Sequence, residues 1–159
     1  MTQKPNLLSV ARKALVQQLE SVQPGNGYRT SAGLNVRSGW FNEIIAAEKS
    51  GFPMIVIQRN DSKTPEAGPG AMKVFPGFHV IGAVEAGLDD YEDALDDLEE
   101  DLVRCLAPSH GTAAPWLPQG VPGIAQGPPR RFPPGNGLKA ATVMIPVYLT
   151  TFIDTIKFR

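Results

Sequence analysis

The chain of 159 residues is 42% hydrophobic and carries fifteen Lys and Arg against sixteen Asp and Glu, a formal net charge of −1. This length suffices for one domain with a substantial core, and the composition excludes a wholly disordered chain. No run of about 18 apolar residues marks a membrane helix, no secretory signal is visible, and a single cysteine, Cys105, excludes an intrachain disulfide. We therefore expect one domain, made in the cytosol, that stays outside membranes.

The first third of the sequence predicts a helix followed by β structure. Residues 6–22 place apolar side chains three and four positions apart, which predicts an amphipathic helix that stops before Pro24-Gly25. Residues 28–36 alternate weakly, and residues 52–58 are a compact β-branched run, so both are predicted strands. Between them, residues 40–49 fit either a short helical turn or a loop.

The middle of the chain predicts a loop, a strand and a second helix. Residues 60–70 (NDSKTPEAGPG) are rich in turn-forming residues and predict a loop. Residues 72–85 alternate as a strand does, with a bend or bulge at Pro76-Gly77. Through residues 91–106, Tyr and Leu side chains recur every three or four positions, which predicts an amphipathic helix.

The last third begins with an unusual segment. Pro108–Gly137 holds eight prolines and six glycines and shows no periodicity, so we expect a long loop or extended arm. Residues 142–158 are rich in β-branched and aromatic side chains and predict a strand, with Pro146 at an edge or bulge. The order of elements predicts an α+β domain: a mostly antiparallel or mixed sheet with two amphipathic helices on one face.

Charge is strongly segregated along the chain. Asp89–Asp101 holds nine of the sixteen carboxylates and no base, so the rest of the chain sums to +8, fifteen bases less seven acids. Such a split favours a protein that meets copies of itself, a partner or a polyanion through opposed surfaces. We predict an exposed acidic face that either contacts a neighbouring subunit or lines a channel, formed by Asp89, Asp93, Asp96, Asp97 and Glu100.

Basic residues provide the complementary candidates. Arg130, Arg131 and Phe132 combine charge with an aromatic ring, and four further bases are candidates for a partner surface: Arg12, Lys13, Arg29 and Arg37. These groups could contact nucleic acid phosphates. The alternative is that they solubilise loops or pair with acidic helices on adjacent copies, which the chain's overall charge favours.

The sequence gives little sign of catalysis. Carboxylates one helical turn apart could act as an acid/base pair or bind a cation, but their spacing matches no calcium loop and no histidine-containing metal set. A thiol and base could come only from Cys105 with His79 or His110, and Cys105 falls on the apolar side of the acidic helix. No phosphate-binding glycine loop or nucleophile elbow occurs. We expect no enzyme activity and no cofactor.

The order of features resembles the tail terminator proteins of long-tailed bacteriophages, also called minor tail protein U-like or tail completion proteins. The similarity covers about three quarters of the chain, and each of its motifs is weak by itself. It follows a helix, a Gly-Tyr-rich strand, two further strands, an acidic helix and a terminal β segment, in the order VARKALVQQLESV, GNGYRTSAGLNV, FPMIVIQRN, FHVIGAVEA, DLEEDLVRCL and VMIPVYLTTF.

The resemblance implies a virion protein that forms a hexameric ring on the head-proximal end of the tail tube. Such a ring ends tube polymerisation and joins the tail to a neck protein, while DNA passes through its lumen without specific binding. The Pro/Gly-rich segment 108–137 departs from the family pattern, so we hypothesise that it reaches a neighbouring subunit or neck protein through Trp116, Arg130, Arg131 and Phe132. The alternatives are another neck or head-closure component, a small bacterial binding domain, or a hydrolase that uses Cys105 or the carboxylates.

Overall fold

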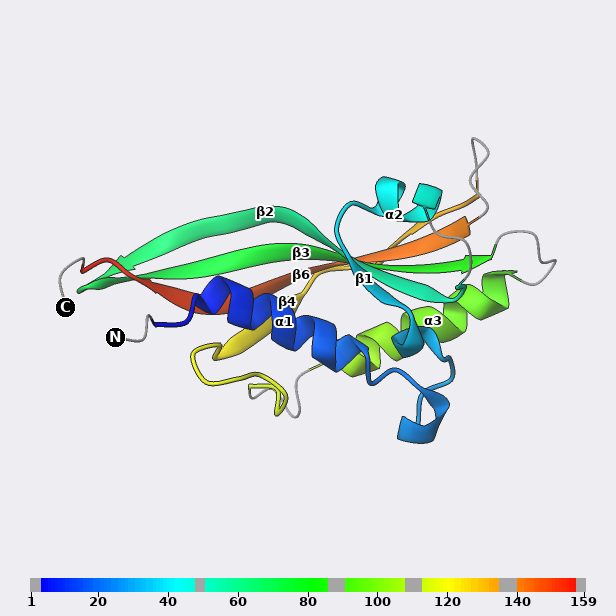
Figure 1. Cartoon of the computed structure of the whole chain (residues 1–159), viewed down its shortest axis with the longest axis horizontal. Helices are drawn as coiled ribbons and strands as arrows, with labels where there is room; N and C mark the ends of the chain where they lie inside the picture. The colour runs from blue at the N-terminus through cyan, green and yellow to red at the C-terminus, as the bar shows by residue number, and fades with distance from the viewer. Residues whose placement is uncertain (1–3, 48–50, 86–90, 108–112, 135–139, 157–159) are drawn as a thin grey trace.

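A computed structural model describes residues 4–47, 51–85, 91–107, 113–134 and 140–156 (Figure 1). The helices are α1 (Leu7–Leu19), α2 (Phe41–Ala47) and α3 (Tyr91–Leu106), with two 3-10 turns, η1 (Pro24–Asn26) and η2 (Ala32–Leu34). The strands are β1 (Val36–Ser38), β2 (Met54–Gly68), β3 (Ala71–Glu85), β4 (Gly123–Gln126), β5 (Arg130–Phe132) and β6 (Ala140–Asp154). The predicted α+β fold is confirmed.

The strands form one mixed sheet. Its order is β1-β2-β3-β6-β4, and β5 also pairs with β6, beyond the end of β4. Only β1 and β2 run parallel, while every other pair is antiparallel. The three long strands β2, β3 and β6 therefore form the centre of the sheet, and the short strands border it.

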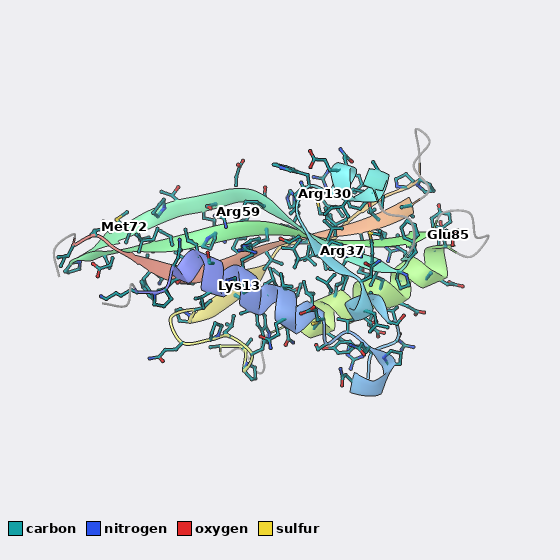
Figure 2. All side chains as sticks on the ribbon, viewed as in Figure 1. Lys13, Arg37, Arg59, Met72, Glu85 and Arg130 are labelled. Carbon is teal, nitrogen blue, oxygen red and sulfur yellow. The ribbon has the colours of Figure 1, made fainter. Side chains whose placement is uncertain are left out.

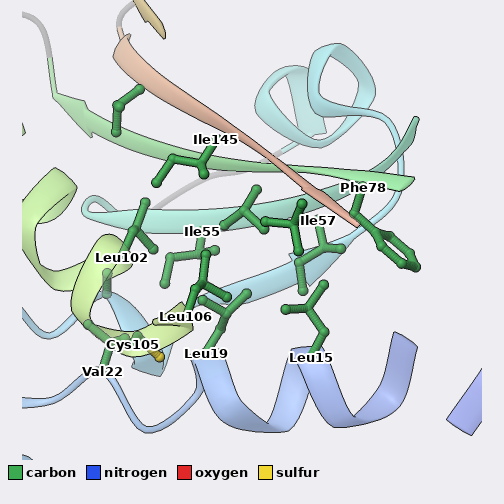
Figure 3. Packing of buried hydrophobic residues seen from close by; sticks show 14 of the residues in the cluster. Leu15, Leu19, Val22, Ile55, Ile57, Phe78, Leu102, Cys105, Leu106 and Ile145 are labelled. Carbon is green, nitrogen blue, oxygen red and sulfur yellow. The ribbon is translucent and has the colours of Figure 1, made fainter. Parts of the chain in front are cut away.

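The two amphipathic helices lie on one face of this sheet, as predicted (Figures 1 and 3). Asn6 caps α1, since its side chain accepts a hydrogen bond from the Leu8 backbone N–H at 2.9 Å. The apolar stripes of both helices pack on the same sheet residues to form the main core, which includes Leu15, Leu19, Leu98, Leu102, Ile55, Phe78 and Ile145. Helix α2 covers part of the opposite face in a smaller cluster around Met54 and Ile81.

Pro146 lies inside β6, and its position there follows from the neighbouring strands. β4 pairs with Val147–Thr150 and β5 with Thr142–Met144, so Pro146 falls in the gap between the two. Its carbonyl accepts a hydrogen bond from the Gly127 N–H at 2.8 Å, and no strand on that side requires the donor that proline lacks. Pro146 therefore lies where no ladder donor is needed, as expected, but it does so at a gap between two bordering strands and not at an edge strand or a bulge.

The predicted loop over residues 60–70 is wrong, because most of it belongs to a long hairpin. β2 continues to Gly68, and each of its residues from 61 to 68 is exposed. Its register against β3 shifts by one residue between Asn60 and Lys63 and again between Lys63 and Glu66. These two bulges lie opposite the Pro76 region, and β3 keeps the same register against β6 on both sides of Pro76.

Together with the ends of β3 and β6, the exposed part of β2 forms a three-stranded extension that runs past α1 (Figure 1). We define this extension as residues 61–68, 71–75 and 151–154. Close packing fixes Gly77 at its base: a Cβ atom there would lie 2.3 Å from the carbonyl oxygen of Asp61, in the first bulge. The extension is therefore held by backbone pairing and by a glycine contact, with few buried side chains of its own.

Two further predictions need correction. Residues 28–36, predicted as a strand, are mostly irregular and contain η2, and only Val36 of that range belongs to β1. The segment 108–137 is not a free arm over its described part, since it carries β4 and β5 along β6. Ala114 and Val121 are buried, so this segment also contributes to the core of its own chain.

Candidate interaction surfaces

The acidic helix α3 separates its side chains sharply. Leu95, Leu98 and Leu102 are buried against the sheet, whereas the outward positions carry exposed carboxylates, namely Glu92, Asp93, Asp96, Asp97 and Glu100. Asp89, also predicted for this face, lies outside the described residues. The structure therefore places four of the five predicted acidic residues together on one solvent-facing surface, which we call the acidic face.

Asp101 differs from the other acids, because its side chain is fully buried. Its carboxylate accepts hydrogen bonds from the Arg29 and Thr30 backbone N–H groups at 2.9 and 2.8 Å, and from the Thr30 hydroxyl at 2.8 Å. A buried carboxylate requires such partners. Asp101 thus anchors the segment after η1 to α3, and it does not belong to the acidic face.

Two of the predicted basic contacts act within the chain. Arg29 forms an ion pair with Glu100, to which its Nε–H donates a hydrogen bond. This hydrogen bond and the negative charge of Glu100 raise the pKa of Arg29. Arg131 of β5 contacts Asp96 at 2.6 Å and Glu99 at 3.0 Å. Both arginines therefore attach neighbouring segments to α3, an intrachain role that the sequence did not reveal.

The acidic face keeps a net negative charge after these contacts. Glu92, Asp93 and Asp97 make no ion pair with any residue that the structure describes. Burying these carboxylates against a basic partner would cost less free energy than burying them against an apolar partner. The acidic face is therefore suited to contact a basic surface or to face water.

The remaining predicted bases are dispersed over the molecule. Arg12 is half-buried and Lys13 exposed on α1, while Arg37 is exposed on β1, near the middle of the long axis (Figure 2). Arg130 is exposed, and its guanidinium lies 5.8 Å from the centre of the Phe132 ring, which is itself exposed. The predicted bases do not form one continuous patch.

Trp116 packs in part on its own chain. Its ring is half-buried and packs against the main core of its own chain. Only the part of its ring that stays exposed could contact a neighbouring molecule, so the role of Trp116 as an anchor stays a prediction. Phe132 remains a candidate for such a contact because its ring is exposed on β5.

The groups considered for nucleophilic catalysis lie apart. Cys105 is buried in the main core, its Sγ donates to the Gln18 carbonyl at 3.3 Å, and burial raises the pKa of its thiol. His79 alternates with core residues Phe78 and Val80 and faces the opposite side of the sheet, where burial lowers its pKa. His110 lies outside the described residues. No thiol–imidazole pair is formed between Cys105 and His79.

A cleft that the sequence did not predict lies beside the start of β2. It consists of two adjoining hollows of about 370 and 350 Å³, which share Ser31, Phe52 and Pro53 in their walls. The first also includes Val84, Ala94, Glu85 and Asp97, and the second includes Leu34 and Arg37. These residues come from four separate segments, so only the tertiary fold brings them together.

A scan against protein-family models and a search of curated proteins each found no match for this sequence. None of the described helices is long and apolar enough to cross a membrane. Within the described residues, no group of three or more His, Cys, Asp or Glu side chains is arranged to hold a metal ion.

Proposed function

We propose that this protein is a structural component of a bacteriophage virion, a tail terminator that closes the head-proximal end of the tail tube. In this proposal six copies form a ring, the ring stops tube polymerisation, and it presents a surface to a neck protein. The order α1, β2, β3, α3, β6 corresponds to the order of segments on which the resemblance rests, apart from the Gly-Tyr-rich segment, which is mostly irregular.

The observation that carries the proposal is the acidic face of α3. A ring of identical subunits needs two different, complementary surfaces on each copy. The acidic face supplies one surface that cannot pair with itself, because like charges repel. Six such faces could alternatively line the lumen, where negative charge would keep DNA from adhering. Both roles require the exposed carboxylates of Glu92, Asp93 and Asp97.

The direct test is growth of tail tubes in the presence of the purified protein. Tube protein would polymerise with and without this chain, and tube lengths and ends would be recorded by electron microscopy. The proposal predicts shorter tubes as the protein is added, with a ring-shaped density at one end. Unchanged lengths and bare ends would contradict it. Binding to a portal or neck protein without binding to tubes would favour the head-closure alternative.

A charge-reversed variant sharpens the test. Asp93→Lys with Asp97→Lys changes two exposed carboxylates and should leave the fold intact, since exposed substitutions usually alter stability by less than about 0.5 kcal/mol. If the acidic face contacts a neighbour, this variant should cap tubes poorly. Glu43→Lys, an exposed charge reversal on α2, is the matched control and should cap normally.

A further inference from the structure

The end of the three-stranded extension carries an exposed apolar tip, which we define as Phe152, Ile153 and Ile156. Their exposed fractions are 38%, 43% and 42%, and they account for three of the seven exposed large hydrophobic side chains in the described chain. They lie within five residues of sequence at one end of the sheet, next to Met72 and Lys73 of β3. Successive strand residues point to opposite faces, so Phe152 and Ile153 make both faces of this end apolar. An apolar group collected in this way favours burial against another surface.

The cleft beside β2 is a recess of suitable chemistry for such a tip. Phe52, Pro53, Val84 and Ala94 give its larger hollow a mainly apolar lining. Leu34, at the border of the smaller hollow, is 73% exposed, the largest fraction among the large hydrophobic residues of the described chain. Burial of Leu34 together with the tip would remove two exposed apolar surfaces from water at once.

Tip and cleft lie far apart on the same chain. In Figure 2, Met72 marks the end of the extension, whereas Arg37 and Glu85, which border the cleft, lie in the middle and at the opposite end of the long axis. One molecule therefore cannot place its own tip in its own cleft. Contact between copies would join two different surfaces, the heterologous type of contact that generates rings.

The edges of the sheet argue against the main alternative, in which copies join strand to strand. The outer edge of β2 carries Pro65 and two bulges, and Pro128 and Pro129 interrupt the opposite edge between β4 and β5. Prolines and bulges are the features by which proteins prevent edge-to-edge pairing. Contacts between copies are therefore expected to use side chains.

We propose that the apolar tip of one copy seats in the cleft of a second copy of this chain. Charge in the larger hollow favours this pairing, because Lys73 lies beside Phe152 at the tip, while Glu85 and Asp97 border that hollow. Arg29 also lines it but is paired with Glu100, and Arg37 borders only the smaller hollow. The proposal rests on the ring-forming function proposed above and names the surfaces that would form the ring.

The test mixes two variants, each defective in one surface. Ile153→Asp alters the tip and keeps the cleft, and Leu34→Asp alters the cleft and keeps the tip. Both side chains are exposed, so both variants should fold, which circular dichroism would check. Val103→Asp, at an apolar position with 37% exposure outside both surfaces, is the matched control. Ile156→Asp serves as a second tip variant.

Light scattering and sedimentation would then report the mass of each sample. Placing an unpaired carboxylate in the contact should weaken association at least about tenfold. We expect each variant alone to be monomeric, the control to assemble as the wild type does, and the mixture to form dimers, because one intact tip and one intact cleft remain.

Three results would overturn the inference: variants that assemble like the wild type, a mixture of monomeric variants that stays monomeric, or a wild type that is monomeric at every concentration tested. None of these decides the proposed function, which the tube-length experiment tests separately. A ring that survives both substitutions, for example, would refute this contact and leave tube capping standing.

Discussion

Replacing Asp101 by alanine would test whether this acid of the stretch 89–101 stabilises the fold. The substitution removes the acceptor of three hydrogen bonds, from the Arg29 and Thr30 backbone N–H groups and the Thr30 hydroxyl. It also removes a fully buried side chain and so leaves a small cavity. The segment held by Asp101 borders the cleft, because Arg29 and Thr30 line it.

The size of the effect follows from these contacts. A hydrogen bond to a charged group contributes about 1.5–3 kcal/mol, and a buried donor left without an acceptor costs a similar amount. The three bonds share one acceptor and are not additive, and the freed N–H groups gain some hydration as the segment loosens. We therefore expect Asp101→Ala to lower the free energy of unfolding by about 3–4 kcal/mol, a large part of the roughly 5–15 kcal/mol typical of a domain.

Urea unfolding followed by circular dichroism measures this difference. Asp97→Ala, one turn earlier on the exposed side of α3, is the control and should change the free energy of unfolding by less than about 0.5 kcal/mol. Asp101→Asn keeps one carbonyl acceptor and should fall between the two. Equal stability of the Asp97 and Asp101 variants would refute the assignment of Asp101 as a buried anchor.

Three further outcomes follow from local structure. Gly77→Ala should lower the free energy of unfolding by about 2 kcal/mol or more, because its Cβ would clash with the Asp61 carbonyl. Gly25→Ala should be nearly neutral in the same urea experiment, because a Cβ added at Gly25 would meet no other atom within 4 Å. The Cys105 thiol, buried and with a raised pKa, should react with a thiol reagent only on unfolding, so rapid reaction in the native protein would contradict its placement. Burial lowers the pKa of His79 below its ordinary 6.5, so the unfolded chain binds this proton more readily. The contribution of neutral His79 to the free energy of unfolding is therefore present above about pH 6.5 and is lost as the pH falls toward the pKa of the folded state. His79→Gln should reduce this pH dependence of stability, which urea unfolding at several pH values would measure.

The sequence predicted the elements whose side chains carry a periodic signal. Helices α1 and α3 each have an apolar stripe, and that stripe is the surface that packs on the sheet. The long hairpin was missed because both faces of residues 61–68 are exposed, which removes the alternation that marks a half-buried strand. Pairing with β3 holds this segment as a strand, and such a distant contact leaves no local pattern.

The candidate surfaces were predicted only in part, because the sequence shows local patterns and not contacts between distant segments. The acidic face is visible from composition, but its internal partners Arg29 and Arg131 lie far from α3 in the sequence. The role of Asp101 did leave a signal, since it lies three residues after the buried Leu98 on the apolar stripe. The cleft left none, because its residues come from segments that only the fold brings together. The apolar tip is one short segment of sequence, but only the fold shows that its side chains are exposed.

The central claim, a closed ring of six copies, is tested most directly by the solution mass of the purified protein at low and high salt. Light scattering should give a mass near six chains at low salt and a smaller mass when salt screens the charged contacts. A mass that stays at one chain or two chains at every concentration and salt, with tail tube protein present as well as absent, would contradict the claim.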